Sequence, residues 1–223
     1  MEARYLRNFD ALTEEEFRAL RAGRVLVVGC GGLGGHLIEL LARLGVGSLT
    51  VVDGDVFEET NLNRQLLSTE ALLGCSKAQA AADRVRAVNS QVSVHPVCQF
   101  LTPGNADSLV AGHDLVMDAL DNTEARKVLS AACSAAGVPM VHGAICGWYA
   151  QVSTILPGSD ALQRIYPGQA VSNKTSLSFT PALCASLQVS EAVKLLTCRR
   201  GELEGRLLFV DLRAMEWQII NLF

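Results

Sequence analysis

The segment RVLVVGCGGLG, residues 24–34, decides the fold of this 223-residue chain. It begins with a continuous apolar run that ends at Gly29. The stretch Leu33–Leu44 then repeats leucine and isoleucine at helical spacing as far as Gly45. This order predicts a buried strand, a glycine turn and a helix, which together open an α/β sheet of the nucleotide-binding type.

The glycine turn carries a nucleotide-binding pattern. It matches G-x-G-x-x-G, and we expect four glycines to border the ligand: Gly29, Gly31, Gly32 and Gly34. Glycines let the backbone approach phosphates, and the N–H groups at the start of the helix are free to bind them. Asp53 follows at the end of the next strand, where an acid can accept hydrogen bonds from ribose hydroxyls. A tight turn without a ligand is the alternative, which this context disfavours.

The rest of the chain alternates strand and helix patterns. The further predicted strands are Ser48–Val52, Val92–Val97, Asp114–Ala119, Pro139–Ala144 and Ala150–Leu156, and the further predicted helices are Ser76–Val88, Asn122–Ala136 and Pro181–Leu196. The segments LLFVDL and MEWQIINLF near the end predict antiparallel edge strands joined near Arg213 and Ala214. The expected fold class is therefore α/β: a Rossmann-like, mostly parallel sheet with helices on both faces and antiparallel C-terminal edge strands.

Length and composition favour one domain over residues 1–223, since 49% of the residues are hydrophobic. We expect an N-terminal arm or helix (1–22), a nucleotide-binding core (24–156), a long loop (157–178), and a C-terminal helix with strands (179–223). The loop has weak periodicity and exceeds the usual length of a connection, which is typical of functional loops.

The bulk properties also exclude several classes of protein. A formal net charge of -4 with scattered lysines and arginines argues against a nucleic-acid partner. The first twenty residues carry too many charges for a signal peptide, so we expect a cytoplasmic protein. No apolar run is long enough for a membrane span. The seven cysteines include no CxxC pair, and most are expected to be small buried residues.

Two cations favour ATP over a dinucleotide as the ligand. Arg64 and Lys77 stand in the stretches DGDVFEETNLNRQ (53–65) and GCSK (74–77). Cleavage of ATP needs cations that neutralise charge on the pyrophosphate, whereas an NAD-dependent dehydrogenase has no evident use for them. Each could instead be an ordinary surface cation.

At this point the chain resembles the ThiF/MoeB/HesA family, the bacterial relatives of ubiquitin-activating enzymes. The matching pieces span nearly the whole sequence in order: RYLRNF, VLVVGCGGLGG, the D-x-D and NLNRQ stretch, GCSKA, DALDN with Arg126, VHGAICGWYAQV and ASLQVSEAVKLL. The resemblance implies a single ThiF-type adenylation domain in which 157–178 is the crossover loop. It also implies that the C-terminal glycine carboxylate of a small ubiquitin-like sulfur carrier, ending in Gly-Gly, attacks the α-phosphorus of Mg-ATP.

The resemblance assigns roles to residues of this chain. The implied catalytic group is Arg64, Lys77, Asp121 and Arg7, where Arg7 reaches the ATP of the partner subunit in a homodimer. The implied nucleotide contacts add Asp53 at the ribose, Asn61 and Gln65 near the phosphates, and Asp55 and Asn122; Asp121 is the carboxylate tied to Mg²⁺. Without the resemblance, Arg7 is a solvated surface charge, Asp55 caps a turn, and Arg126 braces Asp121 by an ion pair.

The chain also departs from the family. Many members hold a structural zinc with two CxxC pairs, so we predict no zinc here. Some members use a cysteine in the crossover loop, but 157–178 contains none, and Cys184 just beyond is expected to be a buried structural thiol. We therefore expect the reaction to stop at the adenylate, with sulfur delivered by a separate sulfurtransferase. His142 is expected to be a satisfied core histidine rather than a substrate contact.

Three other functions compete with carrier activation for thiamin, molybdopterin or a related product. Adenylation of a short peptide carboxylate keeps the chemistry and changes the substrate. An NAD(P)-dependent oxidoreductase is disfavoured by Arg64 and Lys77. A silent scaffold is disfavoured by the intact Arg64, Lys77 and Asp121. In the preferred interpretation the carrier tail lies under the loop 157–178, which gates the site.

Overall fold

The computed structural model, which describes residues 2–168 and 175–223, forms the predicted strand, glycine turn and helix at its centre. Strand β1 (Arg24–Val28) sends Val25 and Val27 into one apolar core and Leu26 and Val28 into a second. A strand buried on both faces has no need of polar alternation, which is why its sequence is a continuous apolar run.

The described residues form a sheet of eight strands in the order β3-β2-β1-β4-β5-β6-β7-β8. Strands β1 to β5 are parallel where they pair, and β6, β7 and β8 are antiparallel to their neighbours, so the predicted fold class is confirmed. The strands after β1 are β2 (Ser48–Val52), β3 (Ser93–Val97), β4 (Leu115–Asp118), β5 (Met140–Cys146), β6 (Tyr149–Ile155), β7 (Arg206–Asp211) and β8 (Glu216–Asn221).

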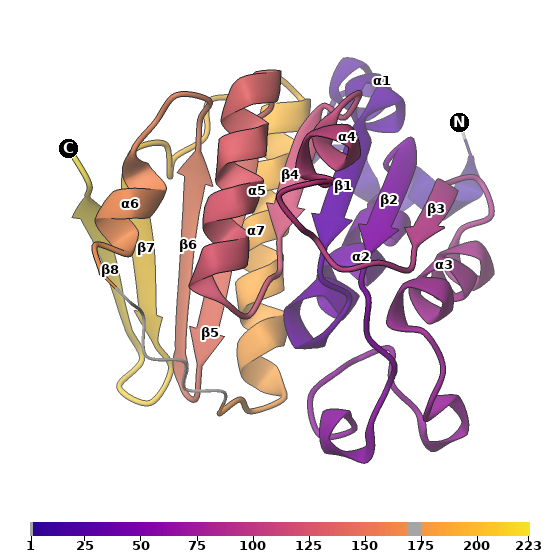
Figure 1. Ribbon diagram of the computed structural model, residues 1–223. Coiled ribbons are helices and arrows are strands. Elements are labelled where there is room, and N and C mark those ends of the chain that lie inside the picture. The colour runs from indigo at the N-terminus through magenta and orange to yellow at the C-terminus, as the bar shows by residue number, and fades with distance from the viewer. Residues whose placement is uncertain (1, 169–174) are drawn as a thin grey trace.

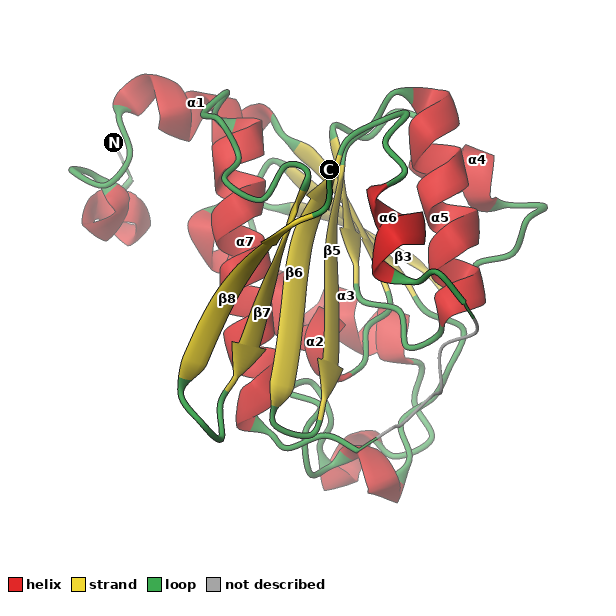
Figure 2. Cartoon of the chain, turned by 90° about the vertical axis from the view of Figure 1, so that its left-hand side faces the viewer, coloured by secondary structure: helices red, strands yellow, loops and turns green. Residues whose placement is uncertain are grey.

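Two layers of helices cover the sheet (Figures 1 and 2). The first layer packs on the core that holds Val25 and Val27: α2 (Gly32–Leu44), α3 (Lys77–Val88) and α7 (Phe179–Leu196), with α1 (Glu14–Ala22) against α7. The second packs on the core that holds Leu26 and Val28: α4 (Ala106–Val110), α5 (Thr123–Ala136) and α6 (Ala161–Ile165). Figure 2 shows the antiparallel strands between α7 on one side and α5 and α6 on the other.

Short elements account for most differences from the sequence expectation. Helices α4 and α6 were not predicted, because five residues are too few for a periodic signal. The described segments 2–168 and 175–223 also contain the 3-10 turns η1 (Ala3–Asn8), η2 (Glu59–Asn61) and η3 (Glu70–Leu72). The expected irregular loop 157–178 thus contains α6, while 169–174 lie outside the described residues. No helix in the described part of the chain has the length and apolar character of a membrane span.

The order of the strands creates a crevice. Strands β1 and β4 are neighbours, but the chain proceeds from β1 to β2 on one side and from β4 to β5 on the other. The connections that leave the carboxyl ends of β1 and β4 therefore run in opposite directions and leave a crevice between them. Ligands of open α/β sheets bind at this point, where the strand order reverses. The predicted glycine turn leaves β1 at this place.

Candidate active site

A cleft of about 890 Å³ lies at the carboxyl ends of β1, β2 and β4. It brings together most of the sequence-predicted residues, which come from four separate segments: Gly29, Gly31, Gly32, Asp53, Asp55, Arg64, Gln65, Lys77, Asp121 and Asn122. Three predicted residues do not line it, namely Gly34, Asn61 and Arg7. The sequence therefore identified the location of the cleft correctly, while the role of each residue depends on its contacts.

The glycines divide into structural and open positions. Gly29 has a φ of +99°, and a Cβ there would lie 2.6 Å from the carbonyl oxygen of Ala119. A Cβ on Gly34 would lie 1.7 Å from the carbonyl oxygen of Gly29, so Gly34 allows the turn to close. Gly31 and Gly32 have room for a Cβ on the cleft side. The structure thus gives Gly34 a packing role, while Gly31 and Gly32 present bare backbone to the cleft.

Asp53 holds the two turns that shape the nucleotide side of the cleft. One carboxylate oxygen accepts a hydrogen bond from the Cys30 N–H at 2.7 Å, and the other accepts from the Asp55 N–H at 2.8 Å. Burial raises the pKa of Asp53, although these two hydrogen bonds oppose that shift. The turn cap suggested for Asp55 is therefore supplied by Asp53, a structural role that the sequence did not indicate.

The two predicted cations differ in their surroundings. Lys77 begins α3 with 7% of its surface exposed, and its Nζ lies 3.2 Å from an Asp55 carboxylate oxygen. An ordinary surface cation is thus the wrong interpretation of Lys77. Arg64 is half-buried, and its Nη1 donates to the Thr60 carbonyl and to the Asn63 side chain, both at 2.9 Å. Both cations line the cleft on the side of the glycine turn.

The two predicted amides separate in the structure. Asn61 accepts a hydrogen bond from the Glu58 N–H at 3.0 Å and closes η2, away from the cleft lining. Gln65 lines the cleft beside Gly31, and its Oε1 is buried without a hydrogen-bond partner among the described residues. A buried acceptor that lacks a donor costs free energy, so Gln65 fits a site completed by a ligand.

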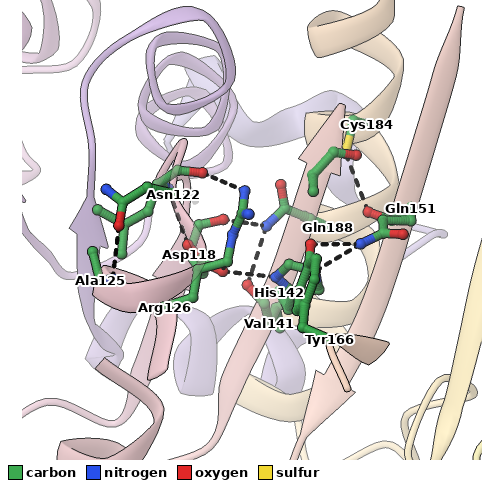
Figure 3. A network of polar contacts seen from close by, with 12 residues as sticks. Asp118, Asn122, Ala125, Arg126, Val141, His142, Gln151, Tyr166, Cys184 and Gln188 are labelled. Carbon is green, nitrogen blue, oxygen red and sulfur yellow. Dashed lines mark hydrogen bonds and ion pairs between the residues drawn. The ribbon is translucent and has the colours of Figure 1, made fainter. Parts of the chain in front are cut away.

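The opposite wall of the cleft contains a polar network that the sequence did not reveal (Figure 3). Strand β4 ends at Asp118, whose carboxylate is fully buried and lies 2.7 Å from Nδ1 of His142 and 3.4 Å from Nε of Arg126. Arg126 also donates to the Leu120 carbonyl at 2.5 Å. Arg126, which the sequence analysis placed beside Asp121, pairs in the structure with the buried Asp118, because α5 returns along β4.

Asp121 and Asn122 lie at the exposed rim of this wall. Asp121 follows the end of β4 by three residues, faces the cleft and is exposed, as a carboxylate that meets substrate should be. Asn122 is the N-cap of α5, and its Oδ1 accepts from the Ala125 N–H at 2.8 Å. Arg7 is exposed on η1, outside the cleft of its own chain. The ligand roles of these three residues stay predictions.

The thiol and the histidine singled out in the sequence are buried. Cys184 has no exposed surface, and burial raises the pKa of its thiol to about 12, so the structural interpretation agrees with its environment. His142 is also fully buried, and burial lowers the pKa of its imidazole against the opposing effect of Asp118. Cys146, which the sequence analysis did not consider, lies in the cleft lining at the end of β5.

Comparison with known proteins gives a consistent result. The ThiF family model matches residues 3–223. The SAMP-activating enzyme E1 of Haloferax volcanii is 38% identical across 97% of this chain and 84% of its own length. The molybdopterin-synthase adenylyltransferase of Salmonella typhimurium is 34% identical across 97% of this chain and 89% of its own. The structure of E. coli MccB with ATP, 19% identical, matches with a TM-score of 0.86 over 100% of this chain and 71% of that chain, a likeness of fold.

Proposed function

The chain belongs to the ThiF family, and on that premise we propose that it adenylates the C-terminal carboxylate of a small ubiquitin-like sulfur-carrier protein. A carboxylate oxygen of the carrier forms a bond to the α-phosphorus of ATP. The bond from that phosphorus to the bridging oxygen breaks, and pyrophosphate leaves with the electron pair. The observation that carries the proposal is a single cleft that combines a bare glycine turn, Arg64, Lys77 and Asp121.

The chemistry requires positioning and charge dispersal rather than a general base. A carboxylate is already ionised at neutral pH, so the protein must bring two anions together and stabilise the charge that moves to pyrophosphate. Lys77 is suited to this role because burial fixes its ammonium beside the turn that Asp53 holds. Arg64 is held by two acceptors of its own segment, Thr60 and Asn63, and its side chain approaches Gly32.

Magnesium accompanies ATP in this proposal. The described cleft lining contains three cationic side chains, Arg64, Lys77 and Arg126, and four acidic ones, Asp53, Asp55, Asp121 and Glu124. These groups alone do not neutralise a triphosphate, and a divalent cation supplies the missing charge when it is bound. Asp121 is the carboxylate that we assign to the ion, because it is exposed, lines the cleft and holds the position that the family resemblance gives to the ion ligand.

We further propose a homodimer in which Arg7 completes the site of the partner subunit. Arg7 is exposed and does not line the cleft of its own chain. The turn that carries it is nevertheless fixed, because Tyr5 is 1% exposed and its hydroxyl accepts a hydrogen bond from Asn89 at 2.8 Å. An exposed arginine on a fixed turn, away from its own cleft, is suited to contact ATP bound by a second copy.

Exchange of labelled pyrophosphate into ATP, in the presence of a purified carrier that ends in Gly-Gly, tests both proposals. Wild type is expected to show carrier-dependent exchange, and Arg64→Ala should lose about 100- to 1000-fold, the range for one charge-stabilising donor. Arg7→Ala should be similarly impaired, and a mixture of the two variants should regain activity in hybrid dimers. ATP binding without exchange for any carrier would overturn carrier activation in favour of a peptide substrate or a silent scaffold. A mixture as inactive as its components would overturn the shared site.

A further inference from the structure

Tyr166 connects helix α6 to the buried network of the cleft. It follows α6 directly, lines the cleft, and its hydroxyl accepts a hydrogen bond from Gln151 Nε2 at 2.6 Å. The same hydroxyl lies 3.3 Å from Nε2 of His142, and the two rings meet edge to face at 5.6 Å. The Arg126 guanidinium lies 5.5 Å from the centre of the Tyr166 ring. Tyr166 therefore contacts the network from the side of the cleft (Figure 3).

The hydrogen bonds of this network have one consistent direction. The Asp118 carboxylate can only accept, so the proton on Nδ1 of His142 is donated to it at 2.7 Å. Nε2 of the neutral imidazole is then an acceptor, and the Tyr166 hydroxyl donates to it while accepting from Gln151. The chain of donors runs from Gln151 through Tyr166 and His142 to Asp118, and it ends on a buried carboxylate. Gln151 Nε2 also lies 3.3 Å from Nε2 of His142, so this imidazole nitrogen is shared by the Tyr166 hydroxyl and the Gln151 amide.

Asp118 also binds the loop that carries Asp121. Its second oxygen accepts a hydrogen bond from the Leu120 N–H at 2.9 Å. Arg126, paired with the same carboxylate, donates to the Leu120 carbonyl. The network thus holds both polar groups of Leu120, and Asp121 is the next residue.

The position of Tyr166 is set by the docking of α6. Ala161 and Leu162 are buried in the second core, against which Leu222 packs. The Arg164 guanidinium lies 4.7 Å from the centre of the Phe223 ring and is also paired with Asp160. Helix α6 contains only five residues, but it is held by the buried side chains at its start and by the contact of Arg164 with Phe223 near its end.

We propose that Tyr166 is a positioning residue of the cleft, which acts through His142 and Asp118 to fix the loop that presents Asp121. The expected effect on the rate rests on the proposed adenylation. The expected effect on the structure of the loop rests on the contacts of Leu120. The hydroxyl of Tyr166 takes no part in bond making; it limits the freedom of the loop. A misplaced catalytic carboxylate lowers the rate of the chemical step more than the affinity for ATP.

The test is Tyr166→Phe, which keeps the ring and removes the hydroxyl. In carrier-dependent pyrophosphate exchange we expect kcat to fall about tenfold while KM for ATP changes less than about twofold. The matched control is Thr197→Val, which removes a buried hydroxyl bonded to the Val193 carbonyl at 2.8 Å at the far end of α7. Its kcat should equal that of wild type. An unchanged kcat in Tyr166→Phe, or an equal fall in Thr197→Val, overturns the proposal.

A second measurement separates this inference from the proposed function. Hydrogen exchange of the Leu120 amide, followed by NMR on the full-length protein, should be about tenfold faster in Tyr166→Phe than in wild type, because its acceptor is less firmly held. If wild type shows no pyrophosphate exchange with any carrier, the proposed function fails, and the Leu120 amide decides: faster exchange supports the positioning role, and wild-type exchange overturns it. Adding Tyr166→Phe to His142→Asn should have little further effect on that amide, whereas additive effects contradict action through His142.

Discussion

The two walls of the cleft place their ion pairs in different surroundings. On the wall of the glycine turn, Lys77 is buried but pairs with Asp55, whose side chain is 55% exposed. On the opposite wall, Asp118 is fully buried and pairs with Arg126, which is 9% exposed along its side chain. The first wall keeps its acidic partner within reach of a ligand and water, whereas the second withdraws its carboxylate into a hydrogen-bonded network, although Arg126 also lines the cleft. One cleft can thus keep the groups that meet substrate apart from the groups that hold its framework.

The walls should therefore respond differently to loss of one partner. Where the remaining charge is hydrated, removal of its partner costs little stability, as is usual for exposed pairs. Where the remaining charge is buried, the uncompensated ion costs several kcal/mol.

The largest effect on stability is expected from Asp118→Ala. Arg126 and His142 lose their shared acceptor inside the protein, and the free energy of unfolding should fall by about 3–5 kcal/mol. Lys77→Met on the other wall is the matched variant, because only the partly exposed Asp55 is left alone. It should change the free energy of unfolding by less than about 1 kcal/mol. Urea denaturation of both variants measures the two changes in the free energy of unfolding. The midpoints can be compared directly if the m values are equal.

Asp118→Asn keeps the same outline and serves if the alanine variant does not fold. The amide can still accept from the Leu120 N–H but cannot balance Arg126, so its stability should lie between those of wild type and Asp118→Ala. Equal losses in the variants of the two walls would contradict the distinction drawn between them.

A smaller effect is expected from pH. Burial lowers the pKa of His142 in the folded protein. As the pH falls through the unfolded value of 6.5, the unfolded chain therefore binds more protons than the folded one, and the free energy of unfolding decreases. The stability that neutral His142 supplies is present above the unfolded pKa and is lost as the pH falls towards the folded pKa.

Asp53 on the other wall behaves oppositely, because burial raises its pKa. Its contribution to stability is lost as the pH rises through the folded pKa.

The measurement is the slope of unfolding free energy against pH for wild type and His142→Asn. His36 and His113 also have pKa values lowered by burial and contribute to the slope of both proteins. The difference between the two slopes isolates His142 and should be at most about 1.4 kcal/mol per pH unit, the value for one proton. Identical slopes would show that His142 is not held neutral by its surroundings.

The sequence predicted the sheet well because its strands and helices are long enough to show their period. The strand Ser48–Val52 was predicted at its observed bounds, and the helix at 122–136 was displaced by one residue only. Helices α4 and α6 were missed, since their burial comes from tertiary contacts such as those of Leu162 rather than from local periodicity.

The site also has one part that could be predicted from the sequence and one part that could not. The wall of the glycine turn is built from residues 29–77, whose spacing along the chain already implies proximity, and Asp53, Arg64 and Lys77 could be named in advance. The opposite wall joins Asp118, His142 and Tyr166 from three separate elements. The acid at the end of β4 and the histidine in the next strand were visible, but only the folded chain brings Tyr166 to them.

The most direct test of the central claim follows the phosphorus atoms of ATP. Wild type is incubated with a carrier ending in Gly-Gly and with ATP that is labelled either at the α-phosphorus or at the γ-phosphorus, and the carrier is then separated and counted. Label from the α position on the carrier, with the γ label recovered in pyrophosphate, is the predicted result, and it should be lost in Lys77→Met. Label from the γ position on the carrier, or no label from either, would contradict adenylation at this cleft.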